Sequence, residues 1–107
     1  MDAGSRLPIA CTLDAAGAEE QLAAWASLRS RFRRALTTDA GIRLWFEPST
    51  EAAVREIAAK EAACCAFLRL AVHREVDAVR LDITSDQADA QPVIALLARE
   101  AGAPATR

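Results

Sequence analysis

The spacing of apolar residues changes several times along this chain, and that change is the strongest constraint on its fold. A period of two residues is typical of a half-buried β-strand, whereas intervals of three or four residues indicate an amphipathic helix. Alternation is found at residues 7–13, 42–47, 68–73 and 79–83. Helical spacing is found at residues 15–36, 50–66 and 85–101. The chain therefore mixes strands and helices and predicts an α+β fold.

Capping and turn residues support these boundaries. Asp14 precedes the first helical stretch as a cap residue, and Ser49 or Thr50 caps the second. Gly102 ends the third helix, and residues 75–77 form the turn of a hairpin. The predicted order is β-α-β-α-β-β-α. We expect a two-layer sandwich in which three helices pack on one face of a four-stranded sheet.

The length of 107 residues predicts a single domain. We assign residues 1–107 to one α+β domain, with an ordered core over about residues 7–101 and a tail over residues 102–107. Because 26 of the residues are alanine, the core available to this domain is thin. Few large side chains are left over for purposes other than packing.

The charge balance excludes some classes of partner. The sequence has 13 basic and 15 acidic residues, so its net charge of −2 argues against nucleic-acid binding, which needs a basic surface. No apolar run approaches the length that spans a bilayer, and residues 1–6 do not resemble a signal peptide. We expect a cytoplasmic protein with no membrane partner.

The three cysteines are the most promising chemistry in the sequence, which has one histidine and no tyrosine. Cys11 falls on the inward row of the first predicted strand, while Cys64 and Cys65 fall where the second helix gives way to a strand. Glu61 precedes them by three and four residues and shares their helical surface. We predict that Cys11, Cys64, Cys65 and Glu61 converge as metal ligands. Thiolates favour soft ions, with Hg(II) the first candidate and Cu(I) or Zn(II) the alternatives.

Two conditions follow from this hypothesis. Successive helical side chains diverge by about 100°, so Cys64 and Cys65 share an ion only if the helix has unwound there. Glu61 lies on the same stripe as Val54 and Ile57 and is therefore predicted to be buried and paired with a polar group. The spacing C-x-x-C, common in structural zinc sites, is absent.

The other polar and aromatic candidates are predicted to be structural. His73 is on the outward row of a strand, so we expect a surface histidine. Trp25 and Phe32 have helical spacing typical of core residues. Trp45 falls on the less buried face of its strand. The arginines of residues 29–34 are predicted to form a solvated helix face.

Four segments resemble a group of small bacterial proteins of actinobacterial type. They are Ile9-Ala10-Cys11-Thr12-Leu13, Trp25 with Leu28, Gly41-Ile42-Arg43-Leu44 and Glu61-Ala62-Ala63-Cys64-Cys65-Ala66-Phe67. The last segment is the most specific. Similar segments also resemble the region appended to some MerR-like, mercury-resistance-type regulators. The resemblance implies a small effector or heavy-metal-linked domain without the DNA-binding half.

The leading hypothesis is a cytoplasmic thiolate-based binding protein for a soft heavy-metal ion or a small thiol-reactive ligand. One alternative is a thiol-dependent enzyme, either a transferase or a lyase of a carbon–metal bond, with a cysteine nucleophile and Glu61 moving a proton. Another is a non-catalytic interaction domain, such as a homodimer joined through a strand edge or the Trp45 face. In the remaining alternative, the cysteines have no chemical role and are only buried core residues.

Overall fold

A computed structural model describes residues 15–104 as a four-stranded sheet with three α-helices. The α-helices are α1 (Ala15–Leu28), α2 (Glu51–Cys64) and α3 (Gln91–Ala101). The strands are β1 (Phe32–Thr37), β2 (Gly41–Phe46), β3 (Arg69–Arg74) and β4 (Val79–Thr84). Short 3₁₀ turns occupy η2 (Arg29–Arg31), η3 (Pro48–Thr50) and η4 (Ala88–Ala90).

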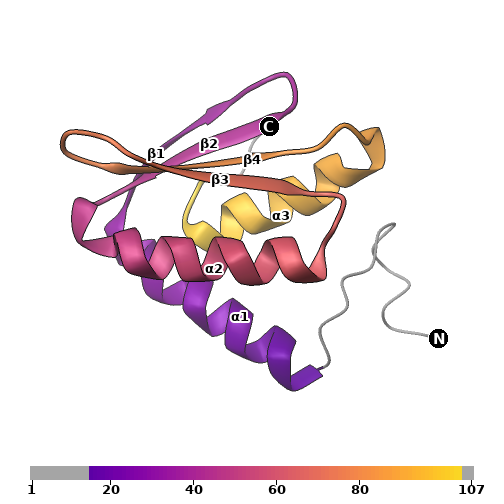
Figure 1. Ribbon diagram of the computed structural model, residues 1–107, viewed down its shortest axis with the longest axis horizontal. Coiled ribbons are helices and arrows are strands. Elements are labelled where there is room, and N and C mark those ends of the chain that lie inside the picture. Colours follow the sequence, from indigo (N-terminus) through magenta and orange to yellow (C-terminus); the bar gives the residue numbers. More distant parts are fainter. Residues whose placement is uncertain (1–14, 105–107) are drawn as a thin grey trace.

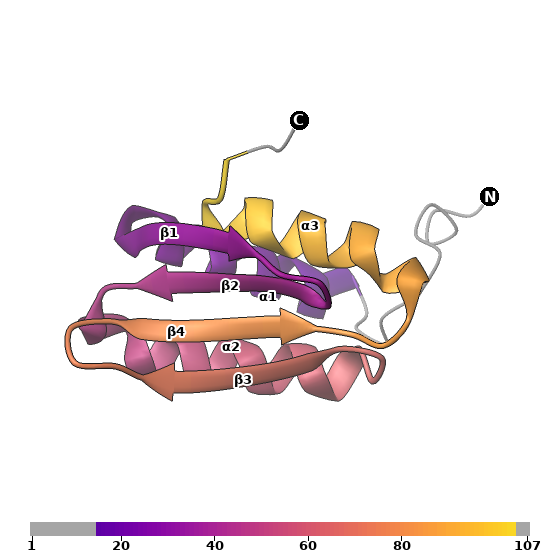
Figure 2. The same ribbon diagram turned by 90° about the horizontal axis from the view of Figure 1, so that it is seen from above.

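The sheet is antiparallel throughout, and its strand order is β1-β2-β4-β3 (Figure 2). The central pair, β2 and β4, aligns Leu44 with Leu81 and Phe46 with Val79, and all four side chains are buried. Since side chains alternate along a strand, these residues share one face of the sheet. That face carries the core.

The helices lie on the core side of the sheet (Figure 1). α2 contacts β3 and β4, and α3 contacts β2. α1 contacts both α2 and α3 and lies on their side away from the sheet (Figure 1). None of the helices in residues 15–104 combines the length and apolar character needed to cross a bilayer.

The α+β class agrees with the sequence prediction, as do three helices and three of the four strands of the sheet, but the fourth strand and the order do not. The described part reads α-β-β-α-β-β-α, because α1 ends at Leu28 and residues 32–37 form β1. The prediction that the first helix continues to Leu36 is therefore wrong, and Leu36 is 48% exposed. The predicted strand at residues 7–13 lies outside the described residues.

The error at β1 has a physical cause. Phe32 and Leu36 continue the helical spacing of Trp25 and Leu28, while a register shift between Phe32 and Arg34 interrupts the alternation that would mark a strand. The strand forms because a short turn lets residues 32–37 pair with β2 along its whole length. Thr38 N–H closes this turn by donating to the Gly41 carbonyl at 2.8 Å. The spacing of apolar residues within 32–37 carries no information about β2, the strand with which this segment pairs.

The other elements follow the prediction within a few residues. α3 ends before Gly102, which adopts φ 117°, a left-handed conformation that favours glycine at the end of a helix. Gly41 has a different role: a Cβ atom placed there would lie 1.9 Å from the Ile83 carbonyl oxygen. The close approach of β2 to β4 thus depends on the missing side chain.

We expect Gly41→Ala to lower the free energy of unfolding by about 2 kcal/mol, since β2 must move away from backbone atoms that have no room to yield. Urea denaturation of the variant and the wild type measures the difference. Ala71→Ser, an exposed change on β3, is the control and should leave the midpoint nearly unchanged. A Gly41→Ala protein as stable as the wild type would contradict this account of the β2–β4 contact.

Candidate metal centre

α2 ends at the first of the two adjacent cysteines. Cys65 has left the helix, with φ −123° and ψ 81°, although its N–H still donates to the Glu61 carbonyl at 2.8 Å. In a continuing helix the two side chains would diverge by about 100°. Here their Sγ atoms lie 3.2 Å apart, so the unwinding that the hypothesis required is present.

The turn that follows Cys65 is held in place by the end of β4. Leu68 N–H donates to the Cys65 carbonyl at 2.9 Å, which tightens the turn. The buried Ser85 donates its hydroxyl to the Phe67 carbonyl at 2.7 Å and accepts the Gln87 N–H at 3.1 Å. A residue 20 positions after Cys65 therefore fixes the path of the chain beside the sulfurs.

Glu61 faces the two sulfurs from one turn earlier in α2. Its side chain is 5% exposed, and its Oε1 lies 3.9 Å from the Cys65 Sγ. One ligand atom each of Glu61, Cys64 and Cys65 falls within 4.8 Å of the others. All three residues are buried. The prediction that Glu61 is buried and polar-paired is confirmed.

Two neutral donors from α1 bind the other carboxylate oxygen of Glu61. Trp25 Nε1 donates to Oε2 at 2.9 Å, and Gln21 Nε2 donates to the same oxygen at 3.1 Å. Gln21 also reaches the Ile57 carbonyl at 3.1 Å. Among the described residues, no basic side chain forms an ion pair with Glu61. Oε2 is thus held by α1, while Oε1 is turned toward the sulfurs.

This carboxylate is in an unusual environment for an anion. A buried charge in a protein is ordinarily paired with an opposite charge or bound to a metal, because neutral hydrogen bonds offset only part of the desolvation cost. Glu61 has two such bonds and a sulfur neighbour. The group is therefore suited to bind a cation at Oε1.

Sequence reasoning found three of these residues and missed two. Trp25 was predicted only as core, and it is fully buried but also a donor to Glu61. Leu22, three residues before Trp25, is 47% exposed, whereas Gln21 is buried. Gln21, Trp25 and Leu28 follow the i, i+4, i+7 pattern. The sequence contains this alternative choice of buried helix positions, but one of the positions is the polar Gln21.

The fourth predicted ligand, Cys11, lies outside the described residues, so its approach to the cluster stays a prediction.

Cys65 is disulfide-bonded in this structure. Its bond does not join it to Cys64, whose Sγ at 3.2 Å is well beyond a covalent sulfur–sulfur distance of about 2.05 Å. Because metals bind thiolates, the cluster as it stands represents the oxidised form of a potential ligand set.

The sulfur separation also bears on coordination number. Two thiolates on one ion, each at about 2.3 Å, lie about 3.8 Å apart at a tetrahedral angle and about 4.6 Å apart in a linear arrangement. The observed 3.2 Å is closer to the tetrahedral value. Small side-chain rotations would reach it, whereas a linear two-thiolate ion would require the sulfurs to separate by more than 1 Å.

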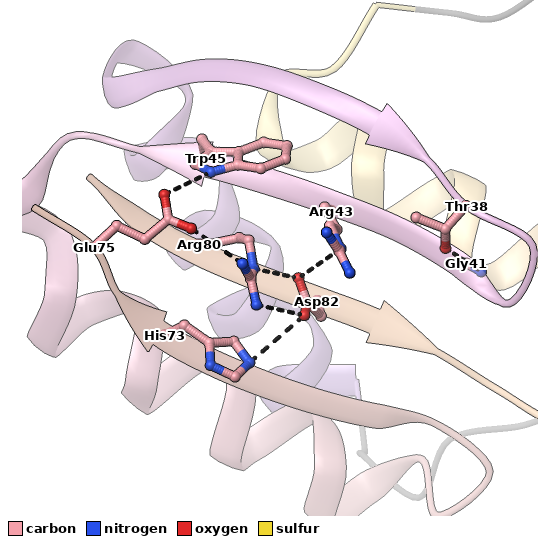
Figure 3. Close-up of polar contacts among 8 residues, drawn as sticks. All are labelled: Thr38, Gly41, Arg43, Trp45, His73, Glu75, Arg80 and Asp82. Carbon is pink, nitrogen blue, oxygen red and sulfur yellow. Dashed lines mark hydrogen bonds and ion pairs between the residues drawn. The ribbon is translucent and has the colours of Figure 1, made fainter. Parts of the chain in front are cut away.

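A second polar cluster covers the sheet face opposite the helices (Figure 3). Trp45 lies on this face but is only 7% exposed, because the Arg34 guanidinium stacks 3.7 Å from its ring centroid. Its Nε1 donates to Glu75 at 3.0 Å. Trp45 thus lies on the sheet face away from the helices, as predicted, but its ring is covered, and the face presents charged groups instead of an aromatic patch.

Asp82 is the centre of this second cluster. Its carboxylate contacts Arg80 at 3.0 Å, Arg43 at 3.8 Å and His73 at 3.6 Å. The His73 side chain is 47% exposed, so the prediction of a surface histidine is confirmed. Arg80 also donates to Glu75 at 3.1 Å. These pairs satisfy one another and leave no convergent set of ligands for a further group.

Comparison with protein-family models, with curated proteins and with solved structures finds no match to this chain. The geometry of the site therefore carries the functional argument. The resemblance to MerR-appended regions remains a hypothesis.

We expect Trp25→Phe to lower the free energy of unfolding by about 1–3 kcal/mol, because it deprives the buried Glu61 carboxylate of a donor. Removing part of the ring also leaves a cavity, so a double-mutant cycle with Glu61→Leu, which removes the acceptor, isolates the hydrogen bond. Urea denaturation of the four proteins gives the coupling energy. A coupling energy near zero would show that Trp25 acts only through packing.

Proposed function

We propose that this protein binds a thiophilic metal ion through the thiolates of Cys64 and Cys65 and through Glu61 Oε1. Cys11, as the sequence predicts, supplies the third thiolate. The observation that carries the proposal is a buried carboxylate that faces two buried sulfurs and has no cationic partner among the described residues. A thiophilic cation would satisfy all of these groups at once.

The number of candidate ligands supports a three- or four-coordinate ion. Three thiolates and one carboxylate oxygen form a tetrahedral set suited to Zn(II), and three thiolates alone suit trigonal Cu(I) or Hg(II). The proposed ligand is thus a soft or borderline ion in a site of three thiolates, with Glu61 as the fourth ligand or its close neighbour.

Binding is favoured over turnover because the sulfurs are inaccessible. The Cys64 and Cys65 side chains are 6% and 0% exposed, and a nucleophilic cysteine has to reach its substrate. A thiol-dependent transferase or lyase would need the residues that cover the sulfurs to move. A cytoplasmic location would keep the thiols in the reduced state that metal binding requires.

We expect Cys64→Ser and Cys65→Ser to weaken binding of Zn(II) and Hg(II) by about two orders of magnitude or more, because serine offers no thiolate. Competition titration with a chromophoric chelator for Zn(II), and with a small thiol for Hg(II), measures the affinities of the reduced proteins. Glu61→Gln should cost about tenfold. Glu56→Gln removes an exposed carboxylate from the same helix and is the matched control.

Thermal midpoints of the metal-free proteins separate a binding effect from a folding effect. Variants that bind Zn(II) and Hg(II) as tightly as the wild type, yet melt at lower temperature, would show that the cysteines are only core residues. A hydroxyl without a partner in a core costs about 1–3 kcal/mol, so such a loss of stability would be measurable.

We also expect the binding to depend on the oxidation state of Cys65. A disulfide sulfur has no thiolate to donate, so air-oxidised protein should take up less than one tenth of the Zn(II) bound by the reduced protein. Treatment with a phosphine reductant, followed by the same titration, should restore one equivalent. Equal uptake before and after reduction would exclude Cys65 as a ligand.

A further inference from the structure

A groove separates the edge strand β1 from α3, away from the cysteine cluster. Its volume is about 690 Å³. The lining comes from β1 and the start of β2, from α3 and from the two residues that follow Gly102. Figure 2 shows α3 running alongside β1. None of Glu61, Cys64, Cys65, Gln21 or Trp25 contributes to this lining, so the groove is a separate feature of the fold.

Small side chains create the groove. Ala35 of β1 points to the helix side of the sheet, since it pairs with Leu44, and Ala95 and Ala98 line the facing side of α3. Three methyl groups cannot fill the space between a strand and a helix. α3 packs instead on β2, and β1 is left at the edge of the sheet beyond it.

The ends of the groove differ in character. At one end, the left-handed Gly102 turns the chain, Ala103 N–H donates to the Ala98 carbonyl at 2.9 Å, and Ala103 and Pro104 join the lining. Phe32 also lines the groove and is fixed by an edge-to-face contact with Phe46. At the other end, Gln91 donates to the Ala40 carbonyl at 3.2 Å.

Of the three arginines that line the groove, Arg99 is the one whose guanidinium has no hydrogen bond, ion pair or stacking contact with the described residues. Arg99 is exposed, lines the groove from the last turn of α3 and forms no ion pair with any acidic side chain of residues 19–104. Nearby Arg29 is paired with Glu100 at 3.3 Å. The guanidinium of Arg33 donates to the Asp77 carbonyl and that of Arg34 covers Trp45, so both are engaged elsewhere.

We propose that this groove is a binding site for a small amphipathic carboxylate, such as a medium-chain fatty acid. The volume lies within the range of about 300–1,000 Å³ typical of small-molecule sites. The apolar body of the ligand covers the alanine methyls, Ile42 and Ile94. Its carboxylate is bound by the Arg99 guanidinium, which is geometrically suited to a two-point contact with a carboxylate.

The binding of decanoate to the full chain, measured by isothermal titration calorimetry, tests this proposal. Ala95→Phe fills the groove from an exposed position of α3 and should abolish measurable binding. Arg99→Gln should weaken it by about tenfold through loss of the charged contact. Ala59→Phe and Lys60→Gln make the same changes on exposed positions of α2 and should bind like the wild type.

Decanol separates the contribution of the carboxylate to the affinity from that of the apolar chain. It lacks the carboxylate and should bind about tenfold more weakly than decanoate. Circular dichroism establishes that each variant is folded. Three results would overturn the proposal. They are the absence of decanoate binding by the wild type at concentrations up to about 1 mM, undiminished binding by Ala95→Phe, and equal affinity for decanol and decanoate.

Discussion

The hydrogen bonds from α1 onto the buried Glu61 carboxylate are the interaction on which this architecture depends. α1 makes its principal contacts with α2 and α3 and not with the sheet. Trp25 and Gln21 are its buried polar links to α2, and both converge on Glu61 Oε2. An unsatisfied carboxylate in that position would be strongly destabilising, so the pairing fixes how α1 sits on α2.

The same carboxylate links the fold to its chemistry. With Oε2 held by α1, Oε1 is directed to the side where α2 ends and the two sulfurs meet. The end of α2 is in turn set by the tight turn at Cys65 and by the bond from Ser85 to the Phe67 carbonyl. Three separate segments of the chain must therefore be in place before the ligand atoms converge.

The charged sheet face is organised differently. Its groups neutralise one another around Asp82 and Glu75 at the surface, where such pairs are screened by water and each contributes little stability. The cysteine cluster is buried and lacks a described cation, and the groove beside α3 carries Arg99. At both places a charged group lacks an opposite charge among the described residues, and these are the two places for which we propose ligand binding.

Periodicity in the sequence was sufficient for the α+β class, for β2, β3, β4, α2 and α3, and for the burial of Glu61 beside Cys64 and Cys65, because each of these follows from spacing within one element. Tertiary structure alone decided the rest. β1 exists because β2 offers it a pairing edge, and Gln21 is buried because Glu61 needs a second donor. The sulfurs lie 3.2 Å apart because residues distant in the sequence hold the end of α2. The spacing of apolar residues indicates which side of an element is apolar, but it does not indicate which other element that side contacts.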